Sequence, residues 1–142
     1  MSLSTPIPFE KRTSLRLPLV SASVEAGFPS SADDHMERGI DLNEELIRNP
    51  AATFLVRVMG ESMRDAGIHA GDVLIVDKSL TPTDRKIVVA MIDGNFTVKR
   101  FRKTNERIFL EAANTSFAPI EVVEEQGLTI WGAVTYIIHQ AR

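Results

Sequence analysis

The stretch that decides the fold is Ile87-Val-Val-Ala-Met-Ile-Asp-Gly-Asn-Phe-Thr-Val-Lys-Arg-Phe101. Its first six residues form a continuous apolar run of strand length, which is typical of a strand buried on both faces. Asp93-Gly94 then separates two β-prone runs, and this dipeptide is a strong signal for a tight hairpin turn. The sequence therefore predicts that residues 96–101 fold back antiparallel against residues 87–92.

Similar apolar runs lie on both sides of this hairpin. Each of them predicts a strand: 54–58, 73–76, 108–110, 120–123 and 128–138. Asp41-Leu-Asn-Glu44 starts like a capping box and is followed by apolar residues at helical spacing, so one short helix is expected to end at Pro50. The predicted fold class is mainly β, an antiparallel β-domain with one short helix.

Residues 1–38 differ in composition from the rest of the chain. They hold seven of the ten serines and four of the seven prolines. Proline disfavours helix and restricts the residue before it to extended conformations, and no apolar period persists in this segment. The composition therefore predicts an extended N-terminal arm over residues 1–38 and a β-rich domain over residues 39–142.

The overall composition excludes several classes of protein. The 142 residues are 44% hydrophobic and 25% charged, with a net charge of −3 and no cysteine. Disulfides, thiolate nucleophiles and cysteine metal sites are therefore excluded, and with only His35, His69 and His139 no metal or other cofactor is expected. The longest apolar run is far shorter than the roughly 20 residues of a membrane span. The run 17–26 is interrupted by Pro18, so no signal peptide is expected and the protein is predicted to be cytoplasmic.

A serine and a lysine are the candidates for chemistry. Gly60-Glu61-Ser62-Met63-Arg64 follows the predicted strand 54–58 and resembles a nucleophile elbow without its second glycine. Strand alternation places Lys99 on the same face as Phe101. Burial there would lower the pKa of Lys99 and give a neutral amine that acts as a general base for a serine. Most serines after glycine are turn residues, however, and most strand lysines reach water, so spacing alone leaves the pairing open.

Several ordered blocks carry a resemblance to a known family. They are Val58-Met-Gly-Glu-Ser-Met-Arg-Asp-Ala-Gly-Ile68, Gly71-Asp-Val-Leu-Ile-Val76, Asp93-Gly94 with Phe96-Thr-Val-Lys-Arg100, Ala113-Asn-Thr-Ser-Phe-Ala-Pro-Ile120 and Trp131-Gly-Ala-Val134. From about Ala26 to the C-terminus the chain resembles the LexA/UmuD family of self-cleaving Ser-Lys peptidases, which implies that family's catalytic β-domain. Since the chain starts at Met1 without a helix-turn-helix domain, it resembles the SOS mutagenesis accessory proteins more than the LexA-type repressors.

The resemblance also implies roles for particular residues and partners. Ser62 corresponds to the family nucleophile, Lys99 to its general base, and Ala26-Gly27 to the bond that the chain cuts in itself. The backbone N–H groups of Ser62 and Met63 are expected to form the oxyanion hole. In this family RecA bound to single-stranded DNA promotes cleavage, and the truncated form is an accessory subunit of an error-prone, UmuC-like DNA polymerase in the SOS DNA-damage response. A homodimer is implied as well, with no membrane and no sequence-specific DNA binding.

Two further segments have alternative interpretations. Lys99-Arg-Phe-Arg-Lys103 with Arg107 could contact DNA or a polymerase, but a solvated strand end is favoured because the net charge is negative. The apolar segment 130–138 is predicted to form an edge strand near the chain end, part of which the monomer buries and the rest of which a second copy would cover.

A different class of function stays open at the level of sequence. The same β-fold with an inert site would be a binding module whose arm recognises a partner protein. Incubating the purified chain at alkaline pH distinguishes the two hypotheses, because only the peptidase would produce a shortened band.

Overall fold

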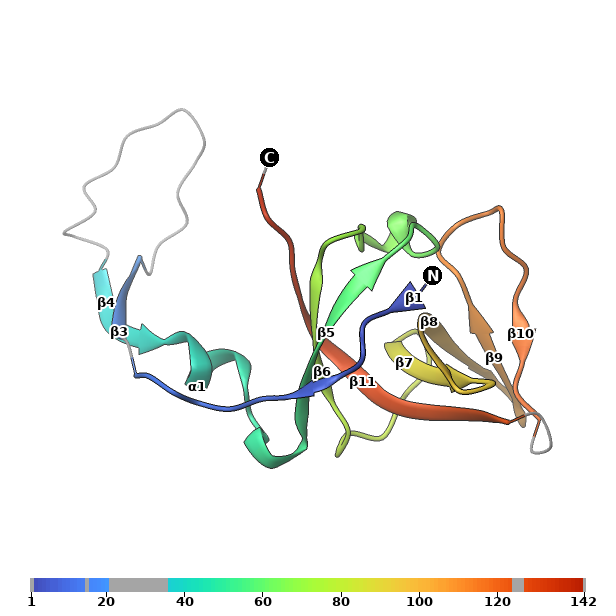
Figure 1. Cartoon of the computed structure of the whole chain (residues 1–142), viewed down its shortest axis with the longest axis horizontal. Coiled ribbons are helices and arrows are strands. Elements are labelled where there is room, and N and C mark those ends of the chain that lie inside the picture. The colour runs from blue at the N-terminus through green and yellow to red at the C-terminus, as the bar shows by residue number, and fades with distance from the viewer. Residues whose placement is uncertain (1, 15, 21–35, 124–126, 142) are drawn as a thin grey trace. The chain divides into compact units, whose positions relative to one another are not determined.

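A computed structural model of the chain describes residues 2–14, 16–20, 36–123 and 127–141. The chain divides into two compact units (Figure 1). One consists of Met1–Phe9 together with Asn49–Arg142, and the other of Glu10–Arg48. The division into an arm over residues 1–38 and a domain over residues 39–142 stays a prediction.

The larger unit contains a nine-stranded sheet. Its strands are β1 (Ser2–Leu3), β2 (Ile7–Pro8), β5 (Thr53–Met59), β6 (Val73–Asp77), β7 (Ile87–Ile92), β8 (Asn95–Thr104), β9 (Arg107–Glu111), β10 (Ile120–Glu121) and β11 (Leu128–Ile138). They are ordered β1-β5-β6-β11-β7-β8-β9-β10, with β2 also paired to β5. All of these pairs are antiparallel, so the predicted mainly β fold class is confirmed.

The predicted hairpin is confirmed in detail. β7 and β8 pair from Ile87 opposite Arg100 to Ile92 opposite Asn95. The two turn residues, Asp93 and Gly94, have φ values of 49° and 81°. Positive φ at both central positions is the requirement of the type I′ turn, whose twist matches that of the strands it joins. Local turn chemistry therefore sets the register of these two strands.

Strand alternation divides the core into two clusters of buried side chains. The first cluster joins β5–β8 with the turn after β5, and it contains Val56, Val58, Met63, Ile68, Leu74, Val76, Val89 and Val98. The second lies on β7–β9 and contains Val88, Ala90, Phe101 and Leu110. Because neighbours on β7 and β8 enter different clusters, these strands are buried on both faces, as their continuous apolar sequences predict.

The last strand lies in a different place from the one predicted. β11 was expected at an edge, but it pairs with β6 on one side and with β7 on the other. Its backbone polar groups are therefore used inside the sheet, and the prediction of an edge strand is wrong. Among its large apolar side chains, Tyr136 and Ile138 are exposed.

The smaller unit contains the described helix and a strand pair. β3 (Arg16–Val20) pairs antiparallel with β4 (Met36–Asp41), and α1 (Leu42–Leu46) follows directly. The Asp41 side chain caps the helix by accepting a hydrogen bond of 2.9 Å from the Asn43 N–H. The helix ends before the predicted stop, because Ile47 is already extended and Pro50 begins a separate 3-10 turn (Pro50–Ala52). In the part of the chain that the structure describes, no helix is long and apolar enough to cross a bilayer.

Candidate active site

The candidate nucleophile lies in the turn that follows β5, here called the nucleophile turn (residues 60–68). Gly60 has a φ of 103°, a left-handed conformation that turns the chain sharply away from the strand. Ser62 is then only 1% exposed. A short 3-10 helix (Arg64–Ala66) and a hydrogen bond of 3.2 Å from the Ile68 N–H to the Met63 carbonyl close the turn. The predicted serine is thus held in a buried, hydrogen-bonded turn.

The Ser62 hydroxyl has an unusual environment. Its oxygen is fully buried and has no hydrogen-bond partner among the described residues. Leaving a buried polar group unpaired costs about 1–3 kcal/mol, so such groups are rare and call for an explanation. Within the same described ranges, the N–H groups of Ser62 and Met63 also donate no hydrogen bond. The nucleophile turn therefore holds one hydroxyl and two backbone N–H groups that make no hydrogen bond to the described residues.

The candidate base lies in the middle of β8. Lys99 is 8% exposed, and its burial lowers the pKa of the amine below the ordinary value of 10.5. Its Nζ lies 5.5 Å from the centroid of the Phe117 ring. No ion pair involves Lys99 in the part of the chain described here. This environment favours the neutral amine that the sequence analysis anticipated.

One loop contacts both of these sites. We call residues 113–119 the bridging loop. Its Asn114 Nδ2 donates to the Glu61 carbonyl at 3.1 Å, and its Ala113 N–H lies 3.2 Å from the Met63 sulfur. The same loop supplies the Phe117 ring beside Lys99. This block is part of the family resemblance, but its residues carry no sequence signal that predicts a role for them.

The other predicted site residues lie outside the described part of the chain. Ala26 and Gly27 belong to residues 21–35, which join β3 to β4. The assignment of the scissile bond therefore stays a prediction, as do the catalytic roles of Ser62 and Lys99.

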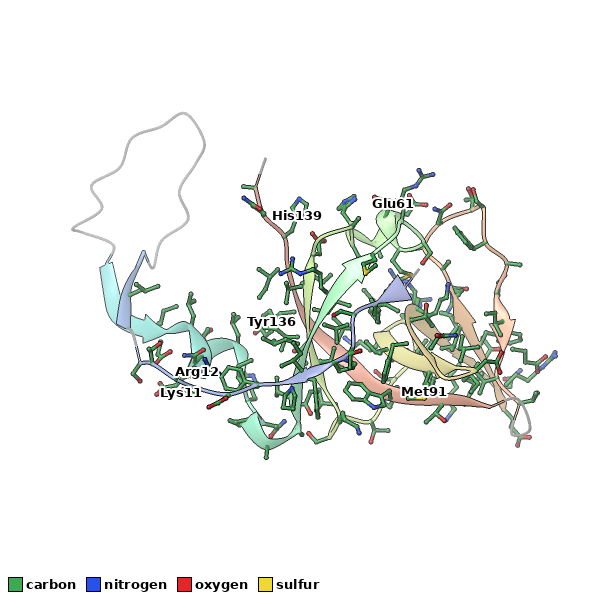
Figure 2. All side chains as sticks on the ribbon, in the orientation of Figure 1. Lys11, Arg12, Glu61, Met91, Tyr136 and His139 are labelled. Carbon is green, nitrogen blue, oxygen red and sulfur yellow. The ribbon has the colours of Figure 1, made fainter. Side chains whose placement is uncertain are left out.

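Two histidines that are far apart in sequence meet beside the nucleophile turn. The rings of His69 and His139 are 5.4 Å apart, and His139 Nδ1 lies 2.6 Å from the Asp72 carboxylate. With Glu61 these histidines line a cavity of about 440 Å³, and Figure 2 shows Glu61 and His139 at the same end of the sheet. Burial alone would raise the pKa of the Asp72 carboxyl, but its hydrogen bonds with the His69 backbone and the His139 ring outweigh burial, so the pKa lies below its ordinary value of 3.8. The described residues include no group of three or more side chains that could hold a metal ion.

The basic strand end is largely neutralised by its neighbours. Arg102 forms ion pairs of 3.2 Å with both Asp84 and Glu111. Arg107 binds Glu121 through two hydrogen bonds of 2.9 Å. Arg102 and Arg107 are thus paired with carboxylates, as expected of a solvated strand end, but Lys99 and Phe101 are buried and do not fit that interpretation.

Comparison with known proteins identifies the family to which the chain belongs. The sequence model of the Peptidase S24-like family matches residues 18–135 of this chain. Protein SamA of Salmonella typhimurium is 46% identical over 125 residues, which cover 88% of this chain and 86% of that protein. Protein ImpA of Escherichia coli is 43% identical over 125 residues, covering 88% and 85%. Protein MucA of Escherichia coli is 41% identical over 122 residues, covering 84% and 82%.

These matches span both the nucleophile turn and β8, and they confirm the family resemblance drawn from the ordered sequence blocks. The chain belongs to the Peptidase S24-like family, as a UmuD-like, self-cleaving serine peptidase involved in SOS mutagenesis.

Proposed function

We propose that Ser62 and Lys99 form a catalytic dyad that cuts the chain's own Ala26-Gly27 bond. The observation that carries this proposal is the buried Ser62 hydroxyl without a hydrogen-bond partner. A buried lysine whose pKa is lowered by burial supports it, since a neutral amine is the base that a serine nucleophile needs. The bridging loop, which contacts the nucleophile turn and Lys99, supports their proximity.

The first half of the reaction forms an ester between the chain and Ser62. The neutral Lys99 amine takes the hydroxyl proton while Ser62 Oγ attacks the carbonyl carbon of Ala26. The negative charge that develops on the carbonyl oxygen is stabilised by the N–H groups of Ser62 and Met63. The C–N bond then breaks, and the Lys99 ammonium gives its proton to the departing amine of Gly27.

The second half returns the enzyme to its starting state. Lys99, neutral again, takes a proton from a water molecule that attacks the Ala26 ester. The bond to Ser62 Oγ breaks, and the proton passes from Lys99 to the serine oxygen. One water is consumed, and the products are a new carboxylate at Ala26 and a new amine at Gly27.

The position of the proposed bond suits a substrate within the same chain. Ala26 lies 36 residues before Ser62, and an extended chain spans about 3.3 Å per residue. A small residue on each side of the bond leaves the carbonyl of Ala26 open to attack. Activation then consists of moving this segment into the site, a shift between undocked and docked states.

The product of cleavage is the first prediction. Cutting after Ala26 removes 26 of the 142 residues and leaves 116, or about 12.8 of 15.7 kDa. We expect intact-mass measurement after alkaline incubation to find this fragment with Gly27 as its first residue. A fragment that begins at any other residue would refute the assignment of the bond.

The partners of the protein follow from the same proposal. We infer that RecA filaments on single-stranded DNA promote docking of the scissile segment, and that the truncated form serves an error-prone, UmuC-like polymerase in the cytoplasm. Family membership supports both statements. Pull-down with RecA filaments and with such a polymerase, using the intact and the shortened chain separately, tests each partner.

We also propose a homodimer in which one protomer can cut the other. Tyr136 and Ile138 are exposed at the end of β11, which leaves apolar area for a second copy to cover. In mixtures of Ser62→Ala chains with Gly27→Glu chains, neither variant can cut itself. We therefore expect a shortened Ser62→Ala product. Absence of that product from mixtures proven to contain heterodimers would exclude the trans route, and a monomeric mass at micromolar concentration would exclude the dimer.

A further inference from the structure

Asn114 is a buried polar side chain that the proposed chemistry does not use. It is 8% exposed, and all of its described hydrogen bonds are within the larger unit. Its Nδ2 donates to the Glu61 carbonyl at 3.1 Å, directly before the nucleophile. Its Oδ1 accepts from the Ser116 N–H at 3.0 Å, and its carbonyl accepts from the Phe117 N–H at 3.1 Å. One side chain therefore ties the nucleophile turn to the fold of the bridging loop.

The bridging loop in turn places an aromatic ring at the candidate base. The Phe117 ring centroid lies 5.5 Å from Lys99 Nζ, although the Phe117 side chain itself is 48% exposed. Single exposed apolar side chains are ordinary on protein surfaces, so the contact with Lys99, and not the exposure of the ring, gives Phe117 its place beside the candidate base. The ring therefore occupies one side of the Lys99 amine.

We propose that Asn114 is a positioning residue for self-cleavage, which fastens the bridging loop to the nucleophile turn and so holds Phe117 as a cover over Lys99. This inference rests on the proposed roles of Ser62 and Lys99. Asn114 touches neither reacting group. It acts through the Glu61 carbonyl on one side and through Phe117 on the other.

The charged groups on the elements packed around Lys99 are bound to other residues, and the remaining neighbours are uncharged. We therefore expect the titration of Lys99 to respond mainly to the position of the Phe117 ring. The residue paired with Lys99 on β7 is Val88, which is apolar and buried. On β9, Glu111 is bound to Arg102, and in the nucleophile turn the Glu61 carboxylate lies 3.8 Å from His69. In the same turn, Arg64 and Asp65 lie 3.7 Å from each other. β1, which packs near β8, carries no charged residue.

The proposal predicts a pH-dependent defect in the variant Asn114→Ala. In this variant the loop is still joined to the nucleophile turn at Ala113, through the Asp65 N–H and the Met63 sulfur, but residues 114–117 lose their own link. Phe117 is then held less firmly, water reaches Lys99, and the amine becomes harder to deprotonate. Self-cleavage should fall about tenfold near neutral pH, and the deficit should shrink as the pH approaches and passes the pKa of Lys99, where the amine becomes neutral in both proteins. Phe117→Ala should show the same pH-dependent defect. Phe117→Tyr keeps the ring, and Thr115→Ala changes an exposed neighbour. Both of these control variants should keep the pH–rate profile of the unmodified chain.

A second measurement does not depend on cleavage. In the uncut Ser62→Ala chain, the ¹³Cε resonance of Lys99 can be followed against pH by NMR and assigned by its loss in Lys99→Arg. Adding Asn114→Ala should move the titration midpoint of Lys99 upward by about one pH unit. Thr115→Ala should leave the midpoint in place.

The two measurements separate this inference from the proposed function. If Ser62→Ala or Lys99→Ala still cleaves, the proposed dyad is wrong. The NMR titration would still test whether Asn114 and Phe117 affect the titration midpoint of Lys99. If Asn114→Ala lowers cleavage equally at all pH values and the midpoint stays fixed, Asn114 is only structural and the inference is overturned. If circular dichroism shows that Asn114→Ala is unfolded, Phe117→Ala decides: a raised midpoint supports the cover, and an unchanged one overturns it.

Discussion

Replacing Ser62 or Lys99 by alanine is expected to abolish self-cleavage, with a loss of at least about 10³-fold in rate. Without Ser62 no nucleophile is present, and without Lys99 the hydroxyl proton has no acceptor. The two losses should not add, because nucleophile and base act as one unit. The double variant should therefore be no slower than either single variant. The disappearance of the 15.7-kDa chain, followed by gel and intact mass over time, measures each rate.

Matched controls make this prediction specific. Ser116→Ala removes an exposed serine hydroxyl, and Lys103→Ala removes an exposed lysine from the same strand as Lys99. Both should cleave like the unmodified chain. Ser62→Ala should also be at least as stable as the unmodified chain in thermal unfolding, since it removes a buried hydroxyl without a partner. Cleavage by Ser62→Ala at the unmodified rate would refute the assignment of the nucleophile.

The rate of self-cleavage is expected to rise about tenfold for each pH unit until the pKa of Lys99 is reached, and then to level off. Only the neutral amine can accept the proton of Ser62, and its fraction grows tenfold per unit below the pKa. Because burial lowers the pKa of Lys99 below 10.5, the plateau should begin below that pH. Rates measured from about pH 7 to pH 10, at fixed ionic strength, define the profile.

Two other causes of a pH-dependent cleavage rate need controls: unfolding of the chain at high pH and titration of lysines on the surface. The melting temperature should stay above the assay temperature at every pH used, and Lys103→Ala should show the same profile as the unmodified chain. A rate that is flat from neutral to alkaline pH, in a chain that still cleaves, would show that the base is not a lysine.

Local chemistry explains which parts of the fold the sequence predicts well. Asp93-Gly94 sets a turn and a register by itself, so β7 and β8 agree with their predicted residues. The place of β11 depends on partners that lie far away in sequence. An apolar run near a chain end has the same composition whether it is central or at an edge, so the edge prediction failed. The early end of α1 at Leu46 likewise depends on the conformation of Ile47, which carries no local signal.

The same distinction holds for the candidate site. The burial of Lys99 is expected for a lysine beside Phe101 on a strand that pairs with a buried apolar run, and the structure confirms it. The link between Asn114 and Glu61 joins residues 53 positions apart through one amide and one carbonyl. Nothing in an Ala-Asn-Thr-Ser run distinguishes such an amide from an ordinary turn residue. Contacts of this kind become visible only when the tertiary structure is known.

The central position of β11 has a consequence for when the protein becomes active during its own synthesis. β5 and β6 flank the nucleophile turn, β8 carries Lys99, and the hydrogen bonds between the two parts of the sheet run through β11. Residues 128–138 are translated after all the other strands of this sheet. A chain translated only as far as β10 therefore lacks the ladder of backbone hydrogen bonds from β6 through β11 to β7, and the sheet that carries both Ser62 and Lys99 can be completed only after the final strand has been made.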